Sequence, residues 1–374
     1  RGKRDVNGYI IFNKESFTKP QIDGLSIKLT IPVSLQIRME RLLDKMKIEL
    51  DAKEIMLAIM DSKDGKIYAM ASSNRYLPKA IKTTDYPSLR SGMIEYSFEP
   101  GSVLKPITFS LLLEHKLVNP YDLVNGHNGR FRMGRKVITD EHRFDWLSAE
   151  NVIVYSSNIG MAQLAQKLSG YEFNQGLQKF GFAQKSTPDL IYEQVGSIPS
   201  AKRLENEIYK ATCAYGYGIR ANLMQLLRAY SVFNNNGRML TPRIVDGFID
   251  VSGQEKILPF AQQIQVIKSA TAQRVKRILI KTVNQGTGKK AITPGLEIGG
   301  KTGTAHIVAK GQYIQKYNTA FMGFANDKTH KYTIGVVVVQ PNKSQFAAQT
   351  AVPVFKQAVD IMIEENYLKP DIIK

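Results

Sequence analysis

Residues 332–340 contain the run Ile-Gly-Val-Val-Val-Val, which constrains the fold of this chain more than any other segment. A strand of this composition must be covered on both faces, because neither of its sides carries polar side chains. The other segments with strand patterns are 296–307, 319–326, and a hairpin of 55–61 and 66–70 around Ser62-Lys63-Asp64-Gly65. Strands are therefore predicted near both ends of the chain.

Helical spacing dominates the rest of the chain. Apolar residues recur at helical intervals over 33–50, 271–284 and 350–367, and the pattern from Ser102 to about residue 285 is mainly helical. We therefore expect an α+β fold in which one antiparallel sheet is built from both ends and covered by the terminal helices. A helical lobe is inserted between the two halves of the sheet, and the cleft between sheet and lobe is the expected site.

Composition narrows the class of protein. The 374 residues are 43% hydrophobic, which is enough for a large core, and the formal net charge of +18 predicts attraction to anionic surfaces. No basic helix or nucleic-acid-binding signature accompanies this charge, so nucleic acid is not an expected partner. The single cysteine allows no intrachain disulfide, and the five histidines lack metal-ligand spacing, so neither a metal nor another cofactor is expected.

The sequence contains neither a phosphate-binding loop nor a membrane-spanning segment. Gly286-Thr287-Gly288-Lys289-Lys290 lacks the earlier glycine and the Ser or Thr of a phosphate-binding loop. No apolar run approaches the roughly 20 residues of a membrane span, and no signal peptide is present. Because the chain opens on Arg1-Gly2-Lys3-Arg4, we expect it to be a portion cut from a longer protein.

The segment Glu99–Pro106 carries the first chemical motif. Pro100-Gly101 ends the preceding segment, and a long apolar helix follows, so Ser102 and Lys105 lie one turn apart on one face. A lysine amine kept neutral by burial can take the proton of a nearby serine hydroxyl. Ser102 and Lys105 are therefore candidates for the nucleophile and base of an acyl-transfer enzyme.

Two later motifs supply the remaining parts of such a site. In Tyr155-Ser156-Ser157-Asn158, the Ser156 hydroxyl could relay a proton and the Asn158 amide could hold a peptide group. Lys301-Thr302-Gly303-Thr304 lies on a predicted strand, where Lys301 brings positive charge and Thr302 and Thr304 bring hydroxyls. Gly303 leaves room for an extended substrate along the strand edge. The backbone N–H groups of Ser102 and Thr304 could form an oxyanion hole.

Each motif also has a purely structural explanation. Ser102 could cap a buried helix, the Ser156 segment could be a loop before a helix, and Gly303 could bend an edge strand. Ser-x-x-Lys also occurs at 16–19 without helical context, so a single match means little. The three motifs together, in this order, match the set that characterises penicillin-binding proteins and serine β-lactamases.

The chain resembles the transpeptidase domain of class B penicillin-binding proteins over about residues 25–368. Beyond the three motifs, the matching segments are 29–31, 62–71, 215–218 with 222–226, and 283–291. The resemblance implies a penicillin-binding transpeptidase or serine β-lactamase-like fold. It also implies the end of a pedestal or linker at 1–28 and a transpeptidase domain at 29–374. The sheet lobe would comprise about 29–75 and 286–374, and the helical lobe about 76–285. Pro32 departs from the family, which commonly has Asp there.

The resemblance further implies a D,D-transpeptidase that cross-links peptidoglycan stem peptides. Ser102 would attack the penultimate D-alanine, Lys105 would accept its proton, and Ser156 and Lys301 would help to protonate the departing D-alanine. Asn158, Thr302, Gly303 and Thr304 would bind the substrate. β-Lactams would acylate Ser102 and be released slowly.

The residues of the three motifs are more similar to those of the cell-division type than to those of the elongation type, which remains the alternative. The resemblance implies a location at the periplasmic face of the bacterial cytoplasmic membrane, with a single-pass anchor that this chain lacks. Its partners would then be division-machinery membrane proteins, including a glycosyltransferase. A serine β-lactamase, a β-lactam sensor domain and an inactive scaffold are weaker alternatives. The chain lacks a convincing class A deacylation element, and all catalytic residue types are present.

Overall fold

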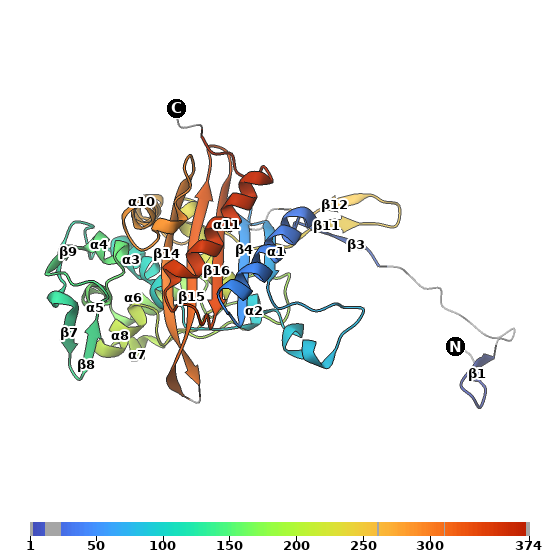
Figure 1. The fold of residues 1–374 in the computed structure, drawn as a ribbon, viewed down its shortest axis with the longest axis horizontal. Coiled ribbons are helices and arrows are strands. Elements are labelled where there is room, and N and C mark those ends of the chain that lie inside the picture. Colours follow the sequence, from blue (N-terminus) through green and yellow to red (C-terminus); the bar gives the residue numbers. More distant parts are fainter. Residues whose placement is uncertain (1–2, 12–23, 260–261, 310, 372–374) are drawn as a thin grey trace. The chain divides into compact units, whose positions relative to one another are not determined.

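A computed structural model of the chain describes residues 3–11, 24–259, 262–309 and 311–371 (Figure 1). These residues fall into two compact units. The larger unit comprises 30–244 and 260–374, and the smaller comprises 1–29 and 245–259. All three sequence motifs lie in the larger unit.

A five-stranded antiparallel sheet forms the centre of the larger unit. Its strands are β4 (Glu54–Asp61), β5 (Ile67–Ser72), β14 (Glu297–Ala309), β15 (Gln312–Asn326) and β16 (Lys331–Val339). Their order across the sheet is β14-β15-β16-β4-β5. The early strands β4 and β5 therefore join the late strands where β16 pairs with β4. β14, which carries the third motif, lies at one edge of this sheet.

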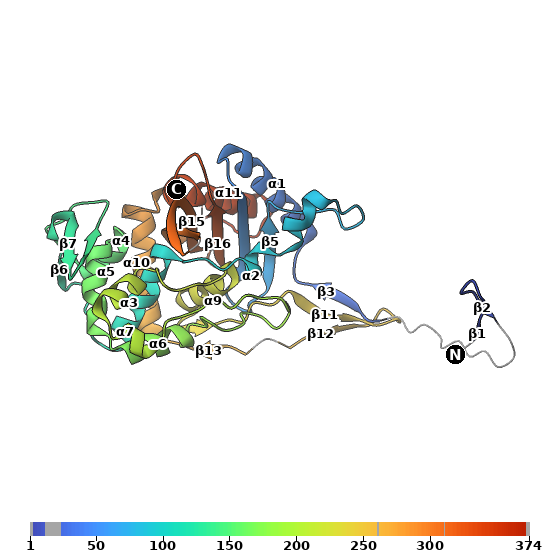
Figure 2. The same cartoon turned by 90° about the horizontal axis from the view of Figure 1, so that it is seen from below.

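The two faces of the sheet pack against different helices (Figure 2). Helices α1 (Val33–Glu49) and α11 (Ala351–Glu364) cover one face, and α9 (Leu223–Asn234) packs against the other. Along β16, Val336 and Val338 join the core under α1 and α11, whereas Val337 and Val339 join the core on the α9 side. Because successive side chains of a strand point to opposite faces, this alternation explains why the whole run is apolar.

The helical lobe is assembled from short helices and small strand pairs. Its helices are α2 (Gly92–Glu95), α3 (Lys105–Glu114), α4 (Ala149–Val154), α5 (Asn158–Leu164), α6 (Gly170–Lys179), α7 (Ala201–Leu204), α8 (Glu207–Ala214) and α10 (Ser269–Gln285). Its strands are β6 (Leu123–Asn125), β7 (Arg130–Met133), β8 (Lys136–Thr139), β9 (Trp146–Ser148), β10 (Arg238–Met239) and β13 (Ile264–Gln265). In the described part of the chain, no helix is both long and apolar enough to span a bilayer.

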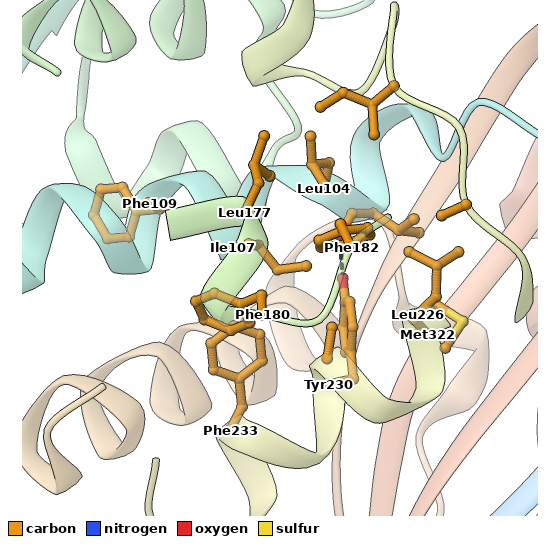
Figure 3. Close-up of a cluster of buried hydrophobic side chains, with 14 of the residues drawn as sticks. Leu104, Ile107, Phe109, Leu177, Phe180, Phe182, Leu226, Tyr230, Phe233 and Met322 are labelled. Carbon is orange, nitrogen blue, oxygen red and sulfur yellow. Dashed lines mark hydrogen bonds between the residues drawn. The ribbon is translucent and has the colours of Figure 1, made fainter. Parts of the chain in front are cut away.

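A buried aromatic and aliphatic cluster joins the start of α3 to α6 and α9 (Figure 3). Leu104, just before α3, and Ile107 of α3 belong to this cluster together with Phe180 and Tyr230. The Tyr230 hydroxyl donates a hydrogen bond of 2.6 Å to the carbonyl of Val103. The backbone one residue after Ser102 is therefore fixed by a hydrogen bond from the core.

In its described residues, the smaller unit contains two separate sheets. β3 (Ser26–Leu29), β11 (Val245–Ile249) and β12 (Glu255–Ile257) form an antiparallel sheet in the order β12-β11-β3, and β1 (Lys3–Arg4) pairs with β2 (Ile10–Ile11). Segments distant in the sequence thus share one sheet.

The predicted α+β architecture is confirmed, with the sheet formed by strands from both ends of the chain. The helices predicted at 33–50, 271–284 and 350–367 correspond to α1, α10 and α11. The strands predicted at 296–307 and 319–326 are present, but both are longer in the structure, where β14 ends at Ala309 and β15 begins at Gln312. Because β14 and β15 pair with each other over this extension, their backbone groups are satisfied although most of the side chains are polar. The mainly helical pattern from Ser102 to about residue 285 also missed the short strands β6 to β13.

Candidate active site

Ser102 lies in a 3₁₀ turn, Gly101–Leu104, directly before α3. Gly101 has a φ of +58°, a conformation that glycine adopts without strain and that turns the chain into the helix. Lys105 is the first residue of α3 and is completely buried, whereas Ser102 is partly exposed. The predicted placement of a serine at the start of a buried helix is confirmed.

This turn lies very close to strand β14. A Cβ atom added to Gly101 would be 2.7 Å from the carbonyl oxygen of Thr304, and one added to Gly303 would be 2.8 Å from a Val103 methyl carbon. Glycine at both positions therefore allows the turn and the strand to touch. The missing side chain of Gly303 faces this contact, which is a packing reason for the glycine in addition to the substrate role that the sequence suggested.

Ser156 occupies a tight turn between α4 and α5. Its φ of +61° is unusual for a residue with a side chain and is held by the two helices on either side. The Ser157 hydroxyl caps α5 by accepting a hydrogen bond from the Gly160 N–H at 2.8 Å. The turn directs the Ser156 side chain toward the two lysines.

Asp140 fixes this turn from the end of strand β8. Its carboxylate accepts hydrogen bonds from the Ser157 hydroxyl at 2.5 Å and from the backbone N–H groups of Asn158 at 2.6 Å and Ile159 at 3.1 Å. A carboxylate at the first N–H groups of a helix is favoured by both hydrogen bonding and the helix dipole. Sequence reasoning missed Asp140, because it lies in a polar segment distant from the residues it contacts.

The two lysines converge on the Ser156 hydroxyl. Nζ of Lys301 lies 2.8 Å from Ser156 Oγ, and Nζ of Lys105 lies 3.3 Å from the same atom. Lys105 also donates to the Ser156 carbonyl at 2.6 Å and to Oδ1 of Asn158 at 2.8 Å. Three of the four predicted catalytic residues and one predicted substrate-binding residue thus form a single hydrogen-bonded group.

Burial changes the ionisation of both lysines. Loss of hydration lowers the pKa of Lys105 to about 7, although the nearby carboxylates of Asp140 and Glu141 act in the opposite direction. The pKa of Lys301 lies well below its usual value, chiefly through burial and secondly because of the charge of Lys105. A lysine with a pKa near neutrality can exist as a free amine and act as a base.

Five of the predicted site residues line a cavity of about 370 Å³, whereas Lys105, Lys301 and Gly303 are not part of its wall. Its lining includes Ser102, Ser156, Asn158, Thr302 and Thr304. The further lining residues are Thr139, Asp140, Glu141, Tyr155, Tyr217, Thr287, His306, Tyr317, Gln345, Phe346, Ala347 and Ala348. Most lining groups are hydroxyls, amides and carboxylates, which suits a polar ligand.

The threonines of the third motif are oriented by neighbouring loops. The hydroxyls of Thr302 and Thr287 lie 2.7 Å apart, and the Thr304 hydroxyl donates to the Gln345 carbonyl at 3.3 Å. Both contacts hold side chains at the wall of the cavity. Thr287 and Gln345 are lining residues that the three motifs did not reveal.

Within the described part of the chain, the Ser102 hydroxyl makes no hydrogen bond, and no cluster of three or more potential metal ligands is found. A hydroxyl without an internal hydrogen bond, in a polar cavity, is available as a nucleophile for covalent catalysis.

Comparison with known proteins identifies the family that the three motifs resemble. Residues 55–360 match the family model described as the penicillin-binding protein transpeptidase domain. Stage V sporulation protein D of Bacillus subtilis is 30% identical over 95% of this chain and 56% of its own length. Peptidoglycan D,D-transpeptidase FtsI of Buchnera aphidicola is 27% identical over 100% of this chain and 63% of its own length.

A solved structure is also similar. The crystal structure of penicillin-binding protein 3 from Mycobacterium tuberculosis, complexed with aztreonam, superposes with a TM-score of 0.86 at 27% identity. The match covers 99% of this chain and 88% of that chain. The fold and the three converging motifs thus define a penicillin-binding type of transpeptidase domain.

This chain belongs to the penicillin-binding protein transpeptidase family, in its class B branch. It spans less than two thirds of the length of the two relatives described above.

Proposed function

We propose that this chain is the catalytic part of a serine-type peptidoglycan D,D-transpeptidase. The observation that carries this proposal is the convergence of two buried lysine amines on Ser156 Oγ, at 2.8 and 3.3 Å, in a cavity that Ser102 also lines. The name of the Buchnera relative and the aztreonam complex of the mycobacterial protein support the same activity. β-Lactams would then acylate Ser102.

The mechanism begins with proton transfer from Ser102 to Lys105. A neutral amine has two N–H groups and one lone pair. The Ser156 carbonyl and Asn158 Oδ1 can accept the two N–H groups, which leaves the lone pair to accept a proton. Ser102 Oγ then attacks the carbonyl carbon of the penultimate D-alanine of a stem peptide.

Collapse of the tetrahedral intermediate breaks the peptide C–N bond. The leaving nitrogen needs a proton, and Ser156 Oγ lies between the two amines that can supply it. Lys105 would return its proton through Ser156, with Lys301 stabilising the relay, and D-alanine would depart. An amine of a neighbouring stem peptide would then attack the ester and release Ser102.

Substrate binding is assigned to the cavity wall. Asn158 would hold the peptide, and Thr302 and Thr304 would hold its terminal carboxylate. Gly303 lies on β14, an edge strand at which an extended peptide could pair with the backbone. The backbone N–H groups of Ser102 and Thr304 would stabilise the oxyanion, and the close contact between their segments supports this assignment.

The cellular role is the finer part of the proposal. We assign the chain to septal wall synthesis at the periplasmic face of the cytoplasmic membrane, with residues 1–28 as the end of a pedestal and 29–374 as the transpeptidase domain. The residues of the three motifs and the similarity to the Buchnera FtsI protein support this role. An elongation-type enzyme remains the alternative. A depletion experiment decides between them, because loss of a septal enzyme gives filaments and loss of an elongation enzyme gives rounded cells.

The activity is tested with a fluorescent penicillin. The parent protein should form a stable adduct on Ser102, and Ser102→Ala should abolish labelling while changing the free energy of unfolding by less than about 1 kcal/mol, since a partly exposed serine contributes little packing. Labelling that persists in Ser102→Ala would contradict the nucleophile assignment. A peptide ending in D-Ala-D-Ala should in addition lose D-alanine only with the parent protein.

The same experiment separates the weaker alternatives. Release of the label within seconds would indicate a β-lactamase, and complete absence of an adduct would indicate a scaffold. A stable adduct without release of D-alanine from the peptide would indicate a sensor domain.

A further inference from the structure

An arginine-rich hairpin leads directly to the cavity. We call residues 130–139, which form β7, a turn and β8, the basic hairpin. Its side chains Arg130, Arg132 and Arg135 are exposed, and the segment contains no aspartate or glutamate. Figure 1 shows β7 and β8 at the end of the helical lobe, beside α5.

The strand register places the arginines in line with the cavity. Arg130 pairs with Thr139, and Arg132 pairs with Val137, so these four side chains share the exposed face of the hairpin. Directly opposed side chains lie about 5 Å apart at Cβ. Because Thr139 also lines the cavity, the row of arginines begins at the cavity wall and continues outward.

These arginines have no acidic partner in the protein. Among the residues that the structure describes, none of the three forms an ion pair, and Arg132 donates only to the Gly134 carbonyl within the same turn, at 3.2 Å. The first carboxylate after the hairpin, Asp140, is occupied by the Ser157 hydroxyl and the Asn158 N–H. Glu141, which follows it at the cavity wall, forms no ion pair with the three arginines among the described residues. The guanidinium groups are therefore available to a ligand.

Lys136, on the opposite face of the hairpin, behaves differently. Its Nζ donates to the Thr212 hydroxyl at 2.9 Å and lies 6.0 Å from the centre of the Tyr215 ring. This lysine fixes the hairpin to α8 and its C-terminal end. The hairpin is thus attached on one face and cationic on the other.

We propose that the basic hairpin binds the carboxylates of an anionic peptide that extends out of the catalytic cavity. This inference rests on the proposed function, since it assigns the hairpin to the part of the substrate beyond the reacting bond. Arginine is suited to the task because its planar guanidinium binds a carboxylate with two parallel hydrogen bonds.

The spacing of the arginines supports a peptide ligand. Residues two apart on a strand are separated by about 7 Å, the distance covered by two residues at the usual rise. Arg130 and Arg132 have this separation, and so do carboxylates on alternate residues of an extended peptide. Because the spacing of the two arginines equals the spacing of these carboxylates, an acidic peptide is favoured over a ligand with a single charge.

Fluorescein-labelled poly(glutamic acid) is the probe for this surface, with binding followed by fluorescence anisotropy at two salt concentrations. The test variant is R130Q/R132Q/R135Q. The matched control is R41Q/K45Q/K53Q, which removes the same amount of charge from exposed positions on and just after α1. Neither set includes a residue of the catalytic group.

The hairpin variant should bind the probe at least about ten-fold more weakly than the parent, and the control should change affinity by less than about two-fold. Acylation by fluorescent penicillin should stay within about two-fold of the parent in both variants, which also shows that they fold. In addition, KM for a D-Ala-D-Ala peptide with several carboxylates should rise in the hairpin variant alone.

Three results would overturn the inference: equal weakening in the two variants, no binding of poly(glutamic acid) by the parent, or preferential binding of inorganic polyphosphate through the same arginines. A parent protein that binds poly(glutamic acid) through the hairpin but is not labelled by penicillin would support the peptide-binding surface and refute the proposed function. The two proposals are therefore distinguishable.

Discussion

At the scale of single residues, the site depends on removing two lysines from water. Lys105 and Lys301 are both completely buried, and both amines lie within hydrogen-bond distance of the Ser156 hydroxyl. An exposed lysine is protonated at neutral pH and cannot act as a base, whereas a buried one loses its charge readily. Burial is therefore the property that turns this otherwise ordinary pair of amines into acid–base groups.

The pH dependence of acylation follows from the pKa of Lys105, which burial lowers to about 7. Only the neutral amine accepts the Ser102 proton, so the acylation rate should rise about ten-fold per pH unit below 7 and level off above it. The check is the second-order rate of labelling by fluorescent penicillin between pH 5.5 and about 8.5. A lysine with its usual pKa would instead give a rate that still climbs at the upper end.

Lys105→Arg is the control for this prediction. It keeps a positive charge but cannot be deprotonated in this range, so labelling should be several orders of magnitude slower at every pH. Thermal unfolding shows whether the variant is folded. A folded Lys105→Arg protein that is labelled at the parental rate would remove Lys105 from the role of base.

At the scale of elements, the sequence revealed the chemical motifs better than their supports. The Ser102, Ser156 and Lys301 segments were each recognisable because the residue types occur at short, fixed spacing. Asp140 was not, because its three hydrogen bonds reach residues much further along the chain and its own neighbours are polar. A contact made only by folding leaves no periodic pattern in the sequence.

Asp140→Ala tests whether this support matters. The change removes the carboxylate from the start of α5 and leaves the Ser157 hydroxyl and two backbone N–H groups without their acceptor. We expect a loss of about 1–3 kcal/mol in the free energy of unfolding. Acylation should also slow at least ten-fold, because the Ser156 turn loses its fixed position.

Ser169→Ala is the matched control for Asp140→Ala. Ser169 caps α6 by accepting a hydrogen bond from the Glu172 N–H, and neither residue lines the catalytic cavity. This variant should lose about 1 kcal/mol of stability and keep the parental acylation rate. If both variants slowed acylation equally, the effect of Asp140 would be one of general stability.

At the scale of the whole molecule, periodicity predicted the main layers of the larger unit. Continuous apolar runs identified β4 and β16, because strands covered on both faces need apolar residues at every position. Helical spacing identified α1, α10 and α11, because burial of one helix face requires that repeat. The pairing of β3 with β11 could not be predicted, since both are short and their burial patterns show little alternation. The first half of β15 was missed because it is mostly exposed and carries polar side chains, so no apolar pattern marks it.

The whole molecule should also become more stable as the pH rises from 7 to 9. In this range an unfolded lysine is protonated, whereas folded Lys105, with a pKa of about 7, becomes neutral, and burial shifts the pKa of folded Lys301 in the same direction. The unfolded state therefore binds more protons, and the free energy of unfolding rises by up to about 1.4 kcal/mol per pH unit for each lysine. Above pH 9 the contribution of Cys213 to stability has the opposite sign, because burial raises its pKa to about 12. The unfolded state then loses the thiol proton before the folded state does, so this residue lowers the free energy of unfolding as the pH rises.

Urea unfolding of the parent and of K105M/K301M at pH 7, 8 and 9 tests this balance. The double variant lacks both titrating amines, so its stability should vary less with pH and the difference between the two proteins should change by about 1 kcal/mol or more per pH unit. Lys45→Met, at an exposed position of α1, should run parallel to the parent. If the free energy of unfolding of the double variant also varied with pH in parallel with that of the parent, the two amines would keep their protons in the folded protein. Lys105 could then not act as a base at neutral pH.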